Sequence, residues 1–364
     1  LVADVPIGVL LSGGIDSSLV TALASKVSDN IKTFNISFPG YGKYDESSHA
    51  KSIAKHFNTE HIELEADDID IDLLYKLVKQ YDEPIADSSM LPTYLVSNLV
   101  RQHCTVALGG DGADELFGGY YHHSRLLWTE GKIRRIPIFI RKFFSKIITS
   151  LTPVGFKGRN WIQAIETDFH NSIPLIGLFF DPKTRIRLLK KQRSKVKIVA
   201  EKVVKNRTFK TSDLLQRITK TDFVNYMTED ILVKVDRASM INSLELRSPF
   251  LDYRIVEFAF SEVPSILKAT TSQRKIILKK MSERLLPPEF NKQRKQGFSI
   301  PLREWLKDGP WRDLFYQVLL ADDCFFDKKT VNDLLLGQDK GRNNTERLFS
   351  LVFFELWRRE HQIS

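Results

Sequence analysis

The stretch Val9-Leu-Leu-Ser-Gly-Gly-Ile-Asp-Ser-Ser18 decides how the first part of the chain folds. The apolar run from Val5 to Leu11 is typical of a strand buried in a parallel sheet, and a helical run that continues to Leu23 starts after the two glycines. A glycine turn between a strand and a helix directs backbone N–H groups and the positive helix end toward one point. The stretch therefore predicts an anion-binding loop.

Asp16 is a carboxylate at a position that otherwise favours anions. A carboxylate beside a phosphate requires a cation between them, and oxygen ligands of this kind are those that Mg²⁺ prefers. The loop is not a Walker A motif, because no Gly-Lys-Ser/Thr follows. Ser-Gly-Gly-x-Asp-Ser resembles the pyrophosphate loop (PP-loop) of the N-type ATP pyrophosphatases, which cleave ATP between the α- and β-phosphates. This resemblance implies ATP and Mg²⁺ as ligands.

The composition is that of an ordinary soluble globular protein, with 42% hydrophobic and 27% charged residues in 364. No apolar run reaches ~18 residues, so we expect no membrane-spanning helix. The two cysteines, Cys104 and Cys324, lie far apart without the spacing of metal ligands. This excludes a disulfide scaffold and a zinc protein, and it predicts a cytoplasmic location.

Strand and helix patterns alternate over the first 119 residues, which predicts a doubly wound parallel α/β sheet. Strands are expected at 5–11, 33–38, 61–64 and 105–108, and helices at 46–57, 67–81 and 92–103. In such sheets ligands lie beyond the carboxyl ends of the strands. From residue 213 the patterns are mostly helical, at 213–233, 236–246, 252–261, 272–285 and 343–360, and residues 307–313 and 336–342 are expected as loops.

The charge is unevenly distributed along the chain. Residues 132–210 hold 20 Lys and Arg against four acids, a net +16, whereas the whole chain carries +9. We therefore expect three regions: a PP-loop core at 1–119, a basic helical insertion at 120–212 and a helical remainder at 213–364. The mixed apolar and basic segment 132–147 either contacts a membrane surface or an anionic partner, or packs on the domain with solvated cations.

A second loop, Gly109-Gly-Asp-Gly-Ala-Asp-Glu-Leu-Phe-Gly-Gly-Tyr120, follows the strand expected at 105–108. Its five glycines and three acids are incompatible with a core element. Glycines that allow close backbone approach, together with carboxylates, predict a second nucleotide and metal loop, with Asp114 as the partner of Asp16 on Mg²⁺. The alternative is an acidic turn that caps a helix starting at Ala113.

The two loops together resemble the synthetase domain of the glutamine-dependent asparagine synthetases, whose relatives include β-lactam synthetases. Further matching segments follow in order: Tyr81–Ser89, Lys234–Met240, Leu246–Asp252, Lys275–Leu278 and Arg294–Phe298, with Pro301 and Trp305. The match covers most of residues 5–119 and 213–306, and the basic insertion only loosely. It implies a fold of the adenine nucleotide alpha hydrolase type.

The resemblance implies a ligase in which the side-chain carboxylate of aspartate attacks the α-phosphate of ATP, and ammonia then displaces AMP. It also implies residue roles. Nucleotide contacts fall to Leu11, Ile36, Gly109 and Gly110, and pyrophosphate contacts to Ser12, Gly13, Gly14, Ser17 and Ser18. Asp16 and Asp114 would hold Mg²⁺, Asp111 and Lys275 would be catalytic, and Asp87, Ser88 and Ser89 would lie at the substrate end. Some relatives have Glu at the position of Asp111 and Ser at that of Gly109.

The family makes ammonia from glutamine with an N-terminal cysteine, whereas this chain begins with Leu1. We expect the glutaminase domain to lie outside this chain, in cis or in trans, and we expect a homodimer. The acceptor that we expect is aspartate, which gives asparagine, and the alternative is a sugar acid or other carboxylate of envelope or polysaccharide biosynthesis. A PP-loop enzyme that modifies tRNA is the least favoured alternative. Because no nucleic-acid motif accompanies the basic segment, we expect no nucleic acid partner.

Overall fold

The computed structural model describes residues 3–66, 69–174, 176–177, 179–189, 199–292 and 299–363, with the side chains of 43, 199 and 200 left out. These residues form two compact units. The sheet unit combines 1–73, 89–124 and 222–301, and the helical unit combines 74–88, 125–221 and 302–364. The units thus do not follow the three consecutive regions, which stay a prediction about the chain's organisation. The matching segment Arg294–Phe298 lies outside the described residues.

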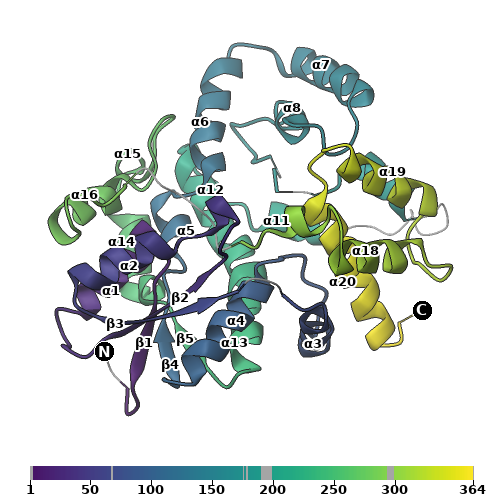
Figure 1. Cartoon of the computed structure of the whole chain (residues 1–364). Helices are drawn as coiled ribbons and strands as arrows, with labels where there is room; N and C mark the ends of the chain where they lie inside the picture. Colours follow the sequence, from purple (N-terminus) through teal and green to yellow (C-terminus); the bar gives the residue numbers. More distant parts are fainter. Residues whose placement is uncertain are drawn as a thin grey trace. The chain divides into compact units, whose positions relative to one another are not determined.

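The sheet unit is built on five parallel strands in the order β3-β2-β1-β4-β5 (Figure 1). The strands are β1 (Ile7–Leu10), β2 (Lys32–Ser37), β3 (Glu60–Glu65), β4 (Val106–Leu108) and β5 (Glu245–Arg247). The chain runs from β1 outward to β3 and then returns to the other side of β1 with β4, so the strand order reverses between β1 and β4. The predicted doubly wound parallel sheet is confirmed. Loops that leave β1 and β4 meet at the reversal, where ligands bind in such sheets.

Helices of the sheet unit pack on this sheet and on one another. One apolar cluster joins Ile15 and Leu19 of α1 with Leu116 of α5 and Leu278 of α16, so that the first and second loops are fixed by the same core. The helical elements here are α1 (Ile15–Ala24), η1 (Gly42–Tyr44), α2 (Ser47–His56), α4 (Met90–Arg101), α5 (Ala113–Phe117), the π-helix η2 (Phe223–Ile231), α13 (Leu232–Met240), η3 (Pro249–Leu251), α14 (Tyr253–Ser261), α15 (Ser265–Lys268) and α16 (Ile276–Leu285).

The helical unit contains α7 (Ile138–Leu151), α8 (Arg159–Ala164), α9 (Pro182–Leu188), α11 (Val199–Asn206), α17 (Leu302–Trp305), α18 (Pro310–Leu320), α19 (Lys328–Asp339) and α20 (Thr345–Glu360). Three helices cross between the units along the chain: α3 (Asp72–Gln80), α6 (Tyr121–Ile133) and α12 (Leu214–Asp222). Within the helical unit the indole of Trp357 donates to the carbonyl of Tyr81 over 2.9 Å. In the described part of the chain, no helix combines the length and apolarity needed to span a bilayer.

Some sequence predictions of elements were wrong. The helix expected at 236–246 ends at Met240, because Ser243 adopts a left-handed conformation (φ 55°) and the chain continues as the edge strand β5. The loop expected at 307–313 is wrong because Gly309 (φ 83°) and Pro310 start α18, and α19 continues to Asp339 through the loop expected from 336.

Candidate active site

The loop after β1 is shaped by Gly13, which has a φ of +71°. A Cβ added there would lie 2.6 Å from the Cβ of His49, so only glycine fits. Gly14 caps α1 without a side-chain hydrogen bond, which leaves the helix start uncapped by any side chain. The backbone N–H of Gly14 donates to Ser12 Oγ over 3.3 Å, and Ser12 Oγ lies 3.1 Å from Ser17 Oγ. The loop therefore directs hydroxyls and a helix N-terminus toward one place, as an anion site requires.

The loop after β4 closes onto the first loop. The backbone N–H of Gly109 donates to the carbonyl of Arg247 over 2.8 Å, which anchors the loop to β5. Gly112 (φ +90°) turns the chain into α5. A Cβ on Gly110 would lie 3.0 Å from the Cβ of Asp16. The two glycine loops are thus in contact.

Lys275 lies between the acidic side chains of both loops. Its ammonium is 2.7 Å from Asp114 Oδ1 and also pairs with Asp16 Oδ2, and the residue is only 5% exposed. Burial alone would lower the pKa of Lys275, but the two carboxylates outweigh it and raise the pKa well above its usual range. Gly119 leaves the space for this contact, because a Cβ there would lie 1.7 Å from Asp114 Oδ1. Lys275 itself has a φ of +52°, a strained conformation held by this packing.

The sequence predicts that Asp16 and Asp114 share a cation. The structure brings both carboxylates together around a cation, and that cation is the Lys275 ammonium. Carboxylate oxygens are also suitable donors for Mg²⁺, so the donor set fits the metal. The assignment of Mg²⁺ to these two residues stays a prediction.

Asp111 lies beside a second lysine that the sequence analysis did not assign to the site. Burial raises the pKa of the Asp111 carboxyl, and the charge of Lys234 partly opposes this. Ser248 Oγ donates to Asp111 Oδ2 over 3.4 Å, and Lys234 Nζ donates to Ser89 Oγ over 2.8 Å. The structure therefore brings the predicted residue Ser89 close to the group around Asp111. The sequence did point to Lys234, because the segment Lys234–Met240 matches the family, but no role was assigned to any residue of this segment.

A cavity of about 400 Å³ opens next to this group. Its lining comes from α13 and β5 and includes Ser248, the residue that donates to Asp111, together with Asp236 and Arg237. The carboxylate of Asp236 and the guanidinium of Arg237 are paired over 2.5 Å. The cavity thus presents both signs of charge beside Asp111.

Four predicted residues have different surroundings. Leu11 and Ile36 are buried in the core of the sheet unit, at 1% and 3% exposure. Asp87 and Ser88 belong to the helical unit, where Ser88 hydrogen-bonds Glu346 and burial raises the pKa of Glu346 to about 7. The nucleotide and substrate roles of these four residues stay predictions.

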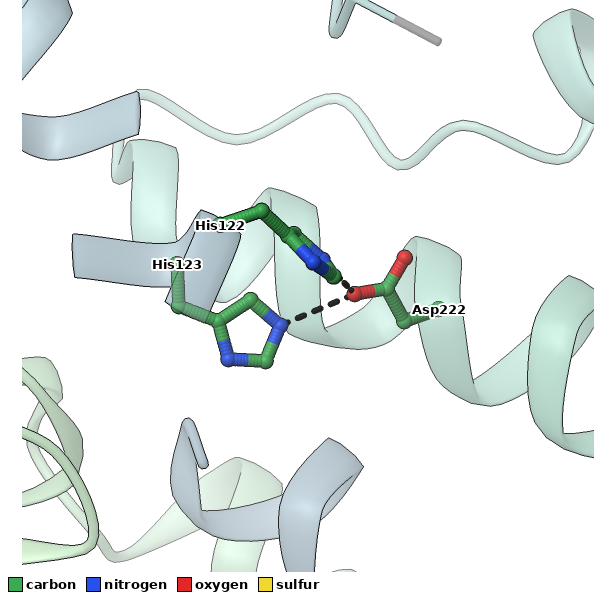
Figure 2. Close-up of side chains that lie close together, drawn as sticks. All are labelled: His122, His123 and Asp222. Carbon is green, nitrogen blue, oxygen red and sulfur yellow. Dashed lines mark hydrogen bonds and ion pairs between the residues drawn. The ribbon is translucent and has the colours of Figure 1, made fainter. Parts of the chain in front are cut away.

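A polar network that the sequence analysis missed lies at the start of α6, with His123 buried and His122 and Asp222 partly exposed (Figure 2). His122 Nε2 and His123 Nε2 are both 2.8 Å from Asp222 Oδ2. Burial would raise the pKa of Asp222, but the two histidines lower it to about 2. Tyr120 stacks on His122 and donates its hydroxyl to Glu115, whose pKa burial raises to about 7.

The three ligand atoms of His122, His123 and Asp222 lie within 4.8 Å of one another, which is close enough for a metal ion. An ionised carboxylate accepts hydrogen bonds only, so each imidazole nitrogen points a proton at Asp222 Oδ2. The three facing atoms are thus engaged with one another through hydrogen bonds. The two hydrogen bonds to Asp222 hold the start of α6 against the last residue of α12, whereas the buried His123 Nδ1 has no hydrogen-bond partner among the described residues.

Comparison with known proteins gives a consistent picture. The family model described as "Asparagine synthase" matches residues 1–359. Asparagine synthetase [glutamine-hydrolyzing] 1 of Bacillus subtilis is 32% identical over 364 residues, covering 98% of this chain and 56% of that protein. Asparagine synthetase [glutamine-hydrolyzing] 3 of the same organism is 25% identical over 339 residues, or 84% of this chain and 48% of that protein. Asparagine synthetase B of Escherichia coli is 34% identical over 144 residues, or 34% of this chain and 25% of that protein. The chain thus spans about half the length of the first of these relatives.

Proposed function

The chain belongs to the asparagine synthase family, and from this premise we propose that it performs the ATP-dependent half of a glutamine-dependent amidotransfer. In this reaction an acceptor carboxylate attacks the α-phosphate of ATP and pyrophosphate leaves. Ammonia then attacks the acyl carbon of the acyl-adenylate, AMP leaves and a proton is lost, which gives the amide. The ion-pair cluster of Asp16, the buried Lys275 and Asp114 between two glycine loops is the observation that carries the proposal.

The first loop supplies the groups that would bind pyrophosphate. The N-terminus of α1 and the hydroxyls of Ser12 and Ser17 converge there. The hydroxyl of Ser18 is fully buried and has no hydrogen-bond partner among the described residues, which supports a role as a donor to the ligand. Attack of one anion on another requires neutralisation of charge, and the buried Lys275 ammonium would stabilise the charge that develops on the departing pyrophosphate.

Asp16 and Asp114 would hold Mg²⁺ in the complex with ATP. The ion would supply further neutralisation of the phosphate oxygens. In the absence of ATP, Lys275 holds the two carboxylates together and so keeps the loops in place.

Asp111 would act on the acceptor side. A carboxyl group with a raised pKa is a better base near neutral pH, which suits the removal of a proton from ammonia as it attacks. The cavity beside Ser248 offers paired charges of Asp236 and Arg237. An amino acid carries both an ammonium and a carboxylate, so this pair favours aspartate as the acceptor and asparagine as the product. A sugar acid, which has no ammonium group, is the alternative.

The test is pyrophosphate release from Mg·ATP and ammonium, scanned over L-aspartate and a panel of other carboxylates. Release that depends on aspartate, with asparagine formed, is the expected result. Release with a sugar acid alone would keep the adenylation chemistry and replace the acceptor. No release with any carboxylate, from protein that binds ATP, would contradict the proposal.

The loop assignments have their own test in ATP–pyrophosphate exchange. Asp16→Ala and Asp114→Ala should abolish exchange, because each removes a carboxylate from the phosphate and cation site. Asp308→Ala, at an exposed position of the helical unit, is the matched control and should leave exchange unchanged. Near-normal exchange in either loop variant would refute the cation site.

We further propose that a glutaminase domain, in cis or in trans, supplies the ammonia. Two of the similar proteins are named as glutamine-hydrolysing and are about twice as long as the matched region. The homodimer and the cytoplasmic location stay predictions, as does the expectation that no nucleic acid binds.

A further inference from the structure

Helix α7 (Ile138–Leu151) turns its polar side toward the protein. The guanidinium of Arg141 donates to the carbonyls of Ile165 and Thr167 over 3.0 and 2.9 Å. Ser145 is fully buried and donates its hydroxyl to the carbonyl of Ile162 over 2.9 Å. These contacts tie α7 to α8, which lies beside it in the helical unit (Figure 1). The inward face of the helix is therefore held by hydrogen bonds to backbone carbonyls.

The apolar side of α7 faces solvent. Phe143 and Phe144 are 61% and 53% exposed, and Phe139 and Leu151, near the two ends of the helix, are 70% and 79% exposed. At about 100° per residue these side chains, with Ile147, lie within one arc of roughly 140° opposite Ser145, and the exposed Ser150 also falls within this arc. An ordinary surface helix buries such a stripe against the core. This helix is amphipathic in the reverse sense.

Cations border the exposed apolar arc. Helix α7 contains three basic residues and no acid, and two of the three, Lys142 and Lys146, are exposed next to Phe139 on the helical wheel. The segment leading into the helix adds the exposed Arg134 and Arg135. A partner must therefore offer an apolar interior and a negatively charged surface together, which is what a bilayer with acidic headgroups provides.

We propose that α7 lies in the interface of an anionic membrane, with its phenylalanines inserted among the acyl chains and its lysines at the headgroups. The sequence allowed two interpretations of residues 132–147: contact with a membrane surface or anionic partner, or packing on the domain. The outward-facing phenylalanines favour contact with a membrane. One helix with a few cations gives reversible binding, so the protein would exchange between membrane and solution. The proposal does not depend on which carboxylate is amidated.

Vesicle flotation tests it directly. The whole chain is mixed with vesicles of phosphatidylcholine alone, or of phosphatidylcholine with phosphatidylglycerol, and the floated fraction is measured. We expect flotation with the phosphatidylglycerol vesicles, and little with phosphatidylcholine alone. Phe143→Ser/Phe144→Ser should lower the partition coefficient by about tenfold or more, since two large apolar side chains no longer insert. Lys142→Gln/Lys146→Gln should lower it about fivefold for each cation, and added salt should lower it further.

Matched control variants show whether the loss of flotation is specific to α7 or follows from removing any exposed aromatic ring or cation. Tyr253→Ser/Phe258→Ser removes two aromatic rings of similar exposure, 69% and 49%, from α14. Lys329→Gln/Lys340→Gln removes two exposed cations at α19. Both controls should float like the unmodified chain. Because the substituted side chains are exposed, circular dichroism should show that every variant is folded.

Two outcomes would overturn the proposal. One is equal flotation of the phenylalanine variant and the unmodified chain. The other is no flotation of the unmodified chain, with a sedimentation coefficient that falls in Phe143→Ser/Phe144→Ser, which would assign the face to a contact between copies of the chain. Pyrophosphate release in detergent-free buffer should be the same for all of these variants, so failure of the membrane proposal is distinguishable from failure of the proposed reaction.

Discussion

Replacing Lys275 with methionine should both loosen the two glycine loops and slow adenylation. Methionine keeps most of the length of the side chain and removes the charge. The ammonium lies 2.7 Å from Asp114 Oδ1, a distance at which two unit charges attract by about 6 kcal/mol at an effective dielectric constant of about 20. The variant loses this attraction and leaves the carboxylates of Asp16 and Asp114 facing each other.

The stability that the variant loses is smaller than this Coulomb attraction, because burying the ammonium in the unmodified chain itself costs free energy. Breaking a buried ion pair typically costs about 3–5 kcal/mol. Here the side chains of Asp16 and Asp114 are 22% and 24% exposed, so water reaches both carboxylates. We therefore expect Lys275→Met to lose stability at the lower end of this range, about 3 kcal/mol. The adenylation rate should fall about 10²- to 10³-fold, with a small change in ATP affinity, because the lost charge acts mainly on the departing pyrophosphate.

Amide hydrogen exchange of the peptides that carry β1 and β4 measures the local effect. A loss of about 3 kcal/mol corresponds to exchange about 150-fold faster. Asp114→Asn/Lys275→Met should recover part of the stability, because one of the two facing charges is gone. Lys280→Met, at an exposed position of α16, is the control and should exchange like the unmodified chain. Exchange in Lys275→Met that matches this control would refute the reasoning.

Three further predictions concern the surroundings of the cluster. Gly119→Ala places a Cβ 1.7 Å from Asp114 Oδ1 and should abolish ATP–pyrophosphate exchange, whereas Gly131→Ala, with nothing within 4 Å, should leave it unchanged. Burial raises the pKa of Glu115 from 4.5 to about 7, so its contribution to stability is present below pH 4.5 and is lost as the pH rises through about 7. Urea unfolding should therefore show the unmodified chain losing about 3 kcal/mol relative to Glu115→Gln between pH 5 and pH 8, and parallel curves would contradict this. The pKa of Asp222 is held at about 2, so Asp222→Asn should cost about 2 kcal/mol at neutral pH and the difference should vanish as the pH falls through about 2; a difference that persists in acid would show that packing, not charge, is responsible.

The first half of the sheet and both glycine loops were predictable from local patterns. Residues 9–18 contain a buried strand, a glycine turn and a helix start in direct succession, and residues 105–120 repeat this order. Because parallel strands have their carboxyl ends at the same edge, both loops were expected at that edge, and their contact follows from the pairing of β1 with β4. The short strand β5 was not predictable, since three residues carry no periodicity and only pairing with β4 makes them a strand.

Lys275 was assigned to the site only through the resemblance to a family. It lies 259 residues from Asp16 along the chain, and its own surroundings in the sequence are those of a solvated basic helix. The contact exists because Leu278 of α16 packs in the same apolar cluster as Ile15 of α1, which carries the start of α16 to the loops. Long-range packing of this kind leaves no local signal.

By itself, then, the sequence determined the groups that the chain can offer: two glycine loops, their carboxylates and the parallel sheet that presents them. Local periodicity and glycine placement are enough for this, because they depend on neighbouring residues only. Which cation bridges Asp16 and Asp114, and which side of α7 faces outward, were decided by the tertiary structure. Both depend on partners distant in sequence, the start of α16 in the first case and the carbonyls of residues 162–167 in the second.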